Sequence, residues 1–230
     1  MRATRSDAID KEQGDADGAA RYLPKVLTLP KLRLASLGCH GCPLWKNGTQ
    51  TVFGEGAVGA RIFFIGEQPG HEEDLSGRPF VGPAGRLLDR ALDDAGIDRD
   101  DAYVTNVVKH FKWEPKGSRR LHKKPNAREI GACLPWLESE IALVKPEVLV
   151  CLGATAAQAL LGKDFKVSTR RGEIVPSRFA PPAVATVHPS SILRLPKDAD
   201  RDAELAHFVE DLRFVASLLR EKGARFRRAR

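Results

Sequence analysis

The feature that most constrains this fold is a series of short, mainly apolar runs with polar residues or glycine at or near their ends. These runs occupy residues 61–67, 102–109, 147–153 and 181–189. A strand buried on both faces is apolar throughout, so each run is typical of a central strand in a parallel sheet. Segments with helical spacing of apolar residues follow, at 82–96, 125–145, 154–162 and 202–222. This order predicts a three-layer α/β/α sandwich around a four-stranded, mainly parallel sheet.

Length and composition indicate one globular domain with tails. The chain has 230 residues, of which 42% are hydrophobic, and no apolar run approaches the roughly 20 residues of a membrane helix. We expect residues 1–24 to be a disordered, mixed-charge lead-in, 25–222 to form the domain, and 223–230 to be a basic tail. The N-terminal segment lacks the apolar stretch of an export signal, so we expect a cytoplasmic protein. We also expect the protein to be a monomer.

Positive charge is concentrated in one segment. The net charge is +7 and the isoelectric point is about 9.4. Residues 109–128 carry eight lysines and arginines against one glutamate, and KGSRRLHKKPN at 116–126 places His122 among five of them. A charge run of this kind is more often a solvated face, with a polyanionic partner as the alternative.

Polar residues follow the predicted strands at their carboxyl ends, where parallel sheets bind ligands. Four segments should therefore converge: 66–70, Asn106 with the basic loop, 153–155 and 188–191. The amide of Asn106 suits the edge of a pyrimidine, and the imidazole of His188 can donate to an oxygen that gains negative charge. Ser190 and Ser191 offer hydroxyl groups to phosphates.

Each motif also has a purely structural interpretation. The turn GEQPG, with Glu67 and Gln68, could be a plain connection, and Asn106 could form a local hydrogen bond. Phe80, in the loop GRPFVGPAG, could be a core plug or a stacking platform for a flat ligand. His188 could be a satisfied structural histidine.

Four cysteines suggest a metal centre. Their spacing is Cys-x2-Cys, a long gap and Cys-x17-Cys, at Cys39, Cys42, Cys133 and Cys151. Without an export signal a disulfide framework is not expected. Two cysteines two residues apart can chelate one metal or cluster from a single turn, with the other ligands supplied from elsewhere in the fold.

Together these motifs resemble the iron–sulfur branch of the uracil-DNA glycosylase superfamily, its family 4-like members. The matching segments are GEQPG, GRPFVGPAG, VTNVVK, HPSS and the cysteine pattern, and the resemblance covers roughly residues 35–220. The resemblance implies the uracil-DNA glycosylase fold, uracil-containing DNA as partner, single-stranded DNA included, and a [4Fe–4S] cluster on the four cysteines. Zinc is the alternative, because four thiolates also suit a tetrahedral zinc site.

The resemblance also assigns roles in a uracil pocket. Phe80 would stack on the base, Asn106 would read its Watson–Crick edge, and Gly66 and Gln68 would complete the contacts. His188 would donate to O2 as the base departs with negative charge. The nucleotide must first flip out of the DNA stack.

The basic loop resembles that of the UdgX group within this branch. The hallmark of that group is Lys-Arg-Arg-Ile-His, and residues 118–122 here read Ser-Arg-Arg-Leu-His. In that group the loop histidine attacks C1′ of the sugar, and the protein stays covalently attached to the abasic site. The resemblance implies His122 as this nucleophile, with Glu67 orienting it or a water. Basic neighbours should disfavour the protonated imidazole.

Phosphate contacts are expected from Arg119, Arg120, Lys123, Ser190 and Ser191, with Arg120 alternatively steadying the loop. Two rival functions stay open. One is a conventional, multiple-turnover iron–sulfur uracil-DNA glycosylase, and the other is a non-catalytic iron–sulfur protein that binds nucleic acid. In each case we expect association with the nucleoid when DNA is bound.

Overall fold

The computed structural model describes residues 18–228, with side chains described up to residue 220. Residues 1–17 of the predicted lead-in and residues 229–230 of the predicted tail lie outside this range. Residues 18–24 belong to the folded domain, which corrects the predicted boundary. They include the 3-10 helix η1 (Ala20–Tyr22), and the N–H of buried Ala19 donates to the carbonyl of Ala132 at 2.7 Å.

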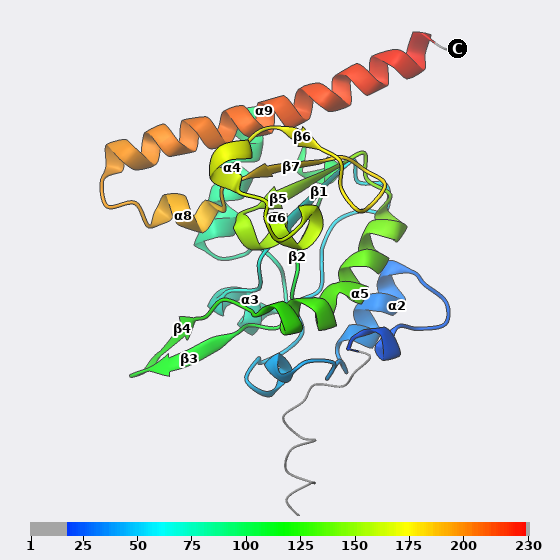
Figure 1. Ribbon diagram of the computed structural model, residues 1–230, viewed down its shortest axis with the longest axis vertical. Helices are drawn as coiled ribbons and strands as arrows, with labels where there is room; N and C mark the ends of the chain where they lie inside the picture. The colour runs from blue at the N-terminus through cyan, green and yellow to red at the C-terminus, as the bar shows by residue number, and fades with distance from the viewer. Residues whose placement is uncertain (1–17, 229–230) are drawn as a thin grey trace, which may run out of the picture.

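The centre of the protein is a five-stranded sheet in the order β2-β1-β5-β7-β6 (Figure 1). The strands are β1 (Ile62–Gly66), β2 (Ala102–Asn106), β5 (Val148–Leu152), β6 (Ile174–Val175) and β7 (Ala183–Thr186). The four predicted strands are all parallel, and β6 is an antiparallel edge strand paired with β7. The predicted four-stranded sheet therefore lacks β6, because two residues are too short to give a periodic signal.

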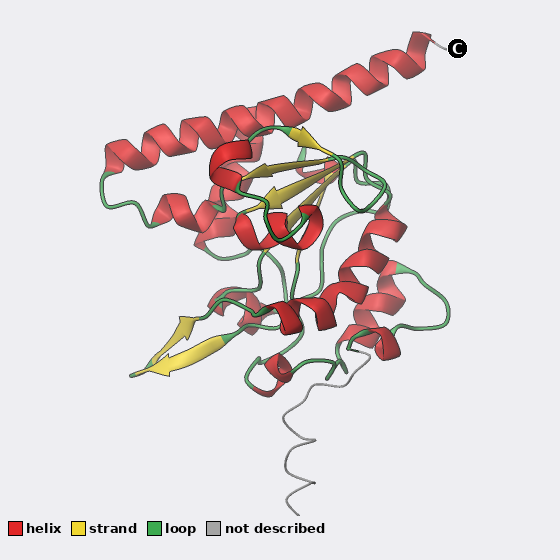
Figure 2. Cartoon of the chain, in the orientation of Figure 1, coloured by secondary structure: helices red, strands yellow, loops and turns green. Residues whose placement is uncertain are grey.

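Helices cover both faces of this sheet, so the predicted three-layer α/β/α sandwich is confirmed (Figure 2). One face packs against α4 (Pro83–Ala95), α8 (Pro189–Leu193) and α9 (Asp198–Arg228). The other packs against α5 (Ala127–Val144), α6 (Ala154–Leu161) and α7 (Val167–Arg170). The backbone of α9 continues through most of the segment predicted as a tail.

Local sequence signals explain where these helices begin and end. Helix α4 has Pro83 in its first turn and ends at Gly96, whose φ of 68° lies in the left-handed region that glycine adopts freely. Helix α5 begins with a capping box, in which the Asn126 side chain accepts from the Glu129 N–H and Glu129 accepts in return. It continues through Pro135 as one helix.

The N-terminal region packs against α5. It contains α2 (Leu29–Ser36) and the 3-10 helix η2 (Pro43–Lys46), and the two flank Cys39 and Cys42. The remaining short helices are α3 (His71–Ser76) and η3 (Arg99–Asp101). Within the described range, no helix is both long and apolar enough to cross a membrane.

The basic segment is a β-hairpin that projects from the domain beside α3 (Figure 1). Its strands are β3 (Trp113–Lys116) and β4 (Arg119–His122), and Trp113 pairs with His122 at the base. The two-residue turn between them contains Gly117 with a φ of 60°, as such tight hairpins require. The sequence predicted a loop here because its charged residues show no apolar alternation.

Candidate active site

A cavity of about 900 Å³ lies at the carboxyl ends of the parallel strands. All four segments expected to converge contribute to its wall, which confirms that prediction. The contributing residues include Glu67, Gln68, Asn106, His122, Gly153, Thr155, His188, Ser190 and Ser191. Phe80 lines the same cavity from the loop before α4.

Gly66 allows two cavity side chains to approach the end of β1. A Cβ atom at this position would lie 2.4 Å from Oδ1 of Asn106 and 2.8 Å from Cζ of Phe80. Only glycine therefore accommodates both neighbours. Asn106 is 3% exposed, and no other described residue hydrogen-bonds to its side-chain amide. Its donor and acceptor are both available to a ligand in the cavity.

Phe80 is held in an unusual backbone conformation. Its φ is 56°, which few residues other than glycine adopt. Gly85 makes this possible, because a Cβ there would lie 1.7 Å from the Phe80 carbonyl oxygen. The ring is stacked relative to His188, with centroids 6.2 Å apart and planes at 29°. It packs on the core and also forms a flat wall of the cavity.

His188 is oriented by the helix that it caps. Its Nδ1 accepts from the backbone N–H of Ser190 at 3.1 Å and lies 2.8 Å from the Ser190 hydroxyl. Burial lowers the pKa of His188 to about 4, and the charge of Arg194 adds to the effect. Since Nδ1 accepts, the neutral ring carries its proton on Nε2 and presents a donor. The Ser191 hydroxyl donates to the His188 carbonyl at 2.7 Å, so both serines support this residue.

His122 and Glu67 face each other across the mouth of the cavity. Nε2 of His122 lies 3.6 Å from Oε1 of Glu67, and the Thr155 hydroxyl donates a short hydrogen bond to Oε2. Partial burial lowers the pKa of His122; the Glu67 charge opposes this shift and the Arg194 charge adds to it. We predicted that basic neighbours would disfavour the protonated imidazole. Arg194 has this effect on the pKa of His122, but burial lowers that pKa more.

Gln68 clamps the base of the hairpin. Its Nε2 donates to the carbonyls of Lys112 and Lys123 at 3.2 Å and 2.9 Å, and its Oε1 accepts from the Lys112 N–H at 3.0 Å. Both amide hydrogens are therefore used by the protein. Gln68 also lines the cavity, so the predicted uracil contact from this residue falls to its backbone.

Arg120 points into the protein. Nη1 lies 2.6 Å from Oδ2 of the fully buried Asp74, and Nε lies 3.1 Å from Nδ1 of His71. The guanidinium also lies over the rings of Phe111 and Trp113, at 5.7 Å and 5.3 Å. These contacts correct the expected phosphate contact of Arg120 and confirm the alternative, that it steadies the basic segment.

Other cations lie on the hairpin and in the cavity wall. Arg119 is exposed on β4, and Lys123 pairs with Glu114 across the hairpin at 2.9 Å. Arg194 donates to the Ser190 hydroxyl at 3.0 Å and lines the cavity together with Lys124. Arg194 was not predicted as a site residue, because nothing in its local sequence places it beside His188.

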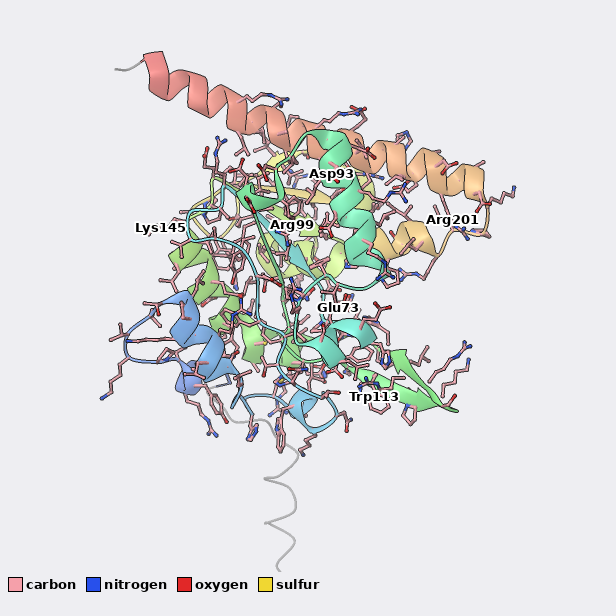
Figure 3. All side chains as sticks on the ribbon, turned by 180° about the vertical axis from the view of Figure 1, so that it is seen from behind. Glu73, Asp93, Arg99, Trp113, Lys145 and Arg201 are labelled. Atoms are coloured by element: carbon pink, nitrogen blue, oxygen red, sulfur yellow. The ribbon has the colours of Figure 1, made fainter. Side chains whose placement is uncertain are left out.

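Glu73 is a second residue that sequence reasoning missed. Its carboxylate accepts from the Gly70 N–H at 2.9 Å and the Gly82 N–H at 2.8 Å. It thereby ties the GEQPG turn to the loop that carries Phe80. In Figure 3, Glu73 and Trp113 lie toward the end of the molecule opposite α9. The available signal was the run of three acidic residues at 72–74, two positions after Gly70, which is typical of the first turn of a helix.

Three of the four cysteines lie together. Cys39, Cys42 and Cys133 share a buried cluster with Trp136. The Trp136 Nε1–H donates to the Cys39 sulfur and the Lys109 N–H to the Cys133 sulfur, both at 3.3 Å. Burial raises the pKa of Cys42 to about 11, and Cys39 adds to the shift. Burial likewise raises the pKa of Cys133, with Cys42 as the next cause.

Cys151 is separate from this group. It lies in β5, where its register pairs it with Ile65 and Ala185, and it packs in the core between the sheet and α6. Burial alone raises its pKa to about 12, with no contribution from another thiol. This placement corrects the predicted four-cysteine ligand set, because a residue fixed inside a central strand cannot reach the N-terminal segment.

The three grouped thiols fit a thiolate-bound metal in their chemistry, since N–H groups that donate to sulfur are the partners such ligands have. Among the described residues, no three histidine, cysteine or acidic side chains are arranged to hold a metal ion as they stand. The structure therefore supports part of a ligand set rather than a complete site.

Comparison with known proteins adds an independent observation. The family model of the Uracil DNA glycosylase superfamily matches residues 53–213. The type-4 uracil-DNA glycosylase of Thermotoga maritima is 40% identical over 187 residues, which cover 80% of this chain and 91% of that protein. The type-4 enzyme of Pyrobaculum aerophilum is 38% identical over 177 residues, covering 74% and 87%. The type-5 enzyme of Thermus thermophilus is 36% identical over 138 residues, covering 53% and 58%.

Proposed function

Since this chain belongs to the uracil DNA glycosylase superfamily, we propose that it excises uracil from DNA by breaking the bond between the base and C1′ of the sugar. One observation carries the proposal: Phe80, Asn106 and His188 line one cavity with a ring face, an unused amide and an imidazole donor. A base must leave the DNA stack to enter such a cavity, at a cost of a few kcal/mol.

Each side chain suits one requirement of the reaction. The ring of Phe80 stacks on the extruded base, and the amide of Asn106 reads the donor and acceptor of its Watson–Crick edge. Charge develops on O2 as the base departs, and the Nε2–H of His188 stabilises it. A neutral imidazole is adequate for this role, since it keeps its Nε2 proton.

The test is release of uracil from matched oligonucleotides containing one deoxyuridine, in single-stranded and in duplex form. Wild type should convert both to abasic product, and Asn106→Leu should lose excision while it still binds DNA with an abasic analogue. Binding of DNA without uracil release by wild type would favour the non-catalytic alternative. Gel filtration of the same preparation tests the expected monomer.

The fate of the sugar separates two versions of this function. After the base departs, C1′ carries oxocarbenium-like positive charge. The relatives are named type-4 uracil-DNA glycosylases, which supports the conventional version, in which water attacks C1′ and the enzyme turns over. Glu67, held by Thr155, would orient that water.

Covalent capture by His122 is the second candidate, and the geometry of the hairpin favours it. The imidazole stands 3.6 Å from Glu67 at the cavity mouth, and its lowered pKa keeps a lone pair available. Gln68 and Arg120 anchor the strand that carries it. A ring nitrogen would form the bond to C1′ as the base leaves, and the Glu67 carboxylate would balance the resulting positive charge.

Denaturing electrophoresis distinguishes the two versions. Capture predicts a protein–DNA band that survives heat and detergent, appears only with uracil-containing DNA and disappears in His122→Ser. Hydrolysis predicts free abasic DNA without such a band. Wild type giving abasic product alone would exclude capture and leave the excision proposal intact.

We also propose a [4Fe–4S] cluster with Cys39, Cys42 and Cys133 as ligands, zinc being the alternative metal. When bound, it would join the N-terminal segment to α5 and thus support the wall that contains Asn106. The fourth ligand would be a residue other than Cys151. His110 is the candidate, as a buried imidazole directly after Lys109, whose N–H contacts the Cys133 sulfur. Broad visible absorption with stoichiometric iron supports the cluster; a colourless protein with stoichiometric zinc contradicts it.

A further inference from the structure

A fully buried ion pair lies directly behind the cavity wall. Nζ of Lys109 lies 2.5 Å from Oε2 of Glu140, and the two side chains are 1% and 0% exposed. The ammonium also donates to the Thr105 hydroxyl at 2.6 Å and to the carbonyl of Asn106 at 2.8 Å. These three acceptors use all three ammonium hydrogens.

Glu140 is satisfied just as completely. Its Oε1 accepts from the Gly54 N–H at 2.9 Å and from the Tyr103 hydroxyl at 3.0 Å. The Thr105 hydroxyl lies within 3.2 Å of both carboxylate oxygens. Burial, followed by the Glu140 charge, raises the pKa of Tyr103, so its hydroxyl remains a donor. Each charged group and hydroxyl of this network therefore has a hydrogen-bond partner within it.

Stability alone does not explain such a pair. Desolvating two charges offsets most of their attraction, and apolar residues of similar volume often serve equally well. A fully satisfied polar network does, however, fix the groups that it contacts. The group fixed here is the peptide of Asn106, the residue whose amide faces the cavity.

Lys109 is also held at its other end. Its backbone N–H donates to the Cys133 sulfur at 3.3 Å, and its carbonyl accepts from the Val52 N–H at 2.8 Å. The Asn106 carbonyl is thus held by a lysine that is itself fixed at both ends. On the cavity side, the missing side chain of Gly66 leaves room for the Asn106 amide. The backbone position from which the Asn106 side chain enters the cavity is therefore fixed.

We propose that Lys109, with Glu140, is a positioning residue that fixes the Asn106 amide for recognition of a pyrimidine edge. The proposal rests on the proposed function, because it takes Asn106 as the base-reading residue. An amide that rotates exchanges its donor for its acceptor, so loss of the clamp weakens discrimination as well as rate. Lys109 itself touches no substrate.

The test uses the full-length double variant Lys109→Met/Glu140→Gln. It removes both charges together, and the glutamine oxygen still accepts from Gly54 and Tyr103. The matched control is Arg61→Met/Glu147→Gln, which removes an ion pair of 2.6 Å at the opposite ends of the strands. Thr105→Val, which removes the hydroxyl that contacts both Lys109 and Glu140 and keeps both charges, is the milder variant, should the double variant fail to fold.

We expect the single-turnover rate of uracil excision to fall by about tenfold or more in the double variant, as for a misplaced contact group. Affinity for DNA with an abasic analogue should be unchanged, because that DNA presents no base to Asn106. The side-chain amide signals of Asn106 in a ¹⁵N–¹H spectrum, assigned with Asn106→Asp, should shift or broaden. The control should match wild type in all three measurements.

A folded double variant with the wild-type rate and unmoved Asn106 signals would overturn the proposal. Equal loss of abasic-DNA affinity and excision would also contradict it, since that indicates a general structural role. If wild type itself releases no uracil, the proposed function fails. The Asn106 signals, which do not depend on activity, then decide whether Lys109 positions this amide.

Discussion

The side-chain amide of Gln68 donates to the carbonyl of Lys123 at 2.9 Å, and this contact ties the turn after β1 to the residue that follows His122. Two further hydrogen bonds join the same amide to Lys112 on the other side of the hairpin. The position of His122 beside the cavity therefore depends on a residue that also lines the cavity.

Replacing Gln68 by alanine should loosen the hairpin. Three hydrogen bonds of about 1 kcal/mol each are lost, so backbone amides of residues 112–123 should exchange with solvent faster. Any covalent capture should slow more than uracil release does. Gln158→Ala is the matched control. The Gln158 side-chain amide donates to the carbonyl of Phe165 at 3.4 Å, and neither residue belongs to the hairpin. Unchanged exchange at Lys112 and Lys123 would contradict the clamp.

Arg120→Met should destabilise the protein far more than Arg119→Met. Arg120 neutralises the fully buried Asp74, and removing one partner of such a pair costs about 3 kcal/mol. Arg119 is exposed on the same strand, and its loss should change the free energy of unfolding by about 0.5 kcal/mol or less. Urea unfolding measures both. Adding Asp74→Asn to Arg120→Met should recover part of the loss, and equal effects of the two arginine variants would refute the assignment.

The sequence predicted the sheet, its covering helices and the converging strand ends because these depend on local apolar patterns. It did not predict which way Arg120 points, since a charge run has no periodicity that distinguishes an inward side chain from an outward one. The contacts of the Gln68 side chain were not predicted for a related reason: its partners are backbone groups 44 and 55 residues away. The separation of Cys151 from the other cysteines could have been predicted. It lies inside the apolar run VLVCL, and strand pairing fixes the positions of the residues in such a run.

Metal content should distinguish the cysteines. Cys133→Ala should lose bound metal, because Cys133 lies with Cys39 and Cys42 and accepts a hydrogen bond at its sulfur. Cys151→Ala should keep the metal and lose about 1 kcal/mol of stability from a small cavity in the core. Iron and zinc analysis of the purified variants makes the comparison. Loss of metal in Cys151→Ala would restore the four-cysteine set.

Acid should destabilise the protein partly through His188. Its pKa is about 4 in the folded state against 6.5 for a free histidine, so below pH 6.5 the unfolded chain binds the proton more readily. Stability from this residue is present above pH 6.5 and falls as the pH drops toward 4. Between pH 7.5 and 5 the loss should be about 2 kcal/mol.

Urea unfolding of His188→Gln at the two pH values tests this linkage. Between pH 7.5 and 5 the variant should lose less stability than wild type, and the two losses should differ by about 2 kcal/mol. His207→Gln, which removes an exposed histidine on α9, should follow the wild-type pH dependence. If wild type and His188→Gln respond identically to acid, His188 does not carry the effect.

Gly66→Ala should impair excision without unfolding the protein. The new methyl group would meet Asn106 Oδ1 at 2.4 Å and Phe80 Cζ at 2.8 Å, so both side chains must move. A displacement near 1 Å of a recognition group lowers the rate by about 100-fold. Gly131→Ala, in α5 with no atom within 4 Å of the added carbon, should keep full activity and gain slight stability. Single-turnover excision and thermal unfolding measure both variants. Wild-type activity in Gly66→Ala would mean that Asn106 and Phe80 need not hold their observed positions, and the base-recognition roles given to them would fail with it.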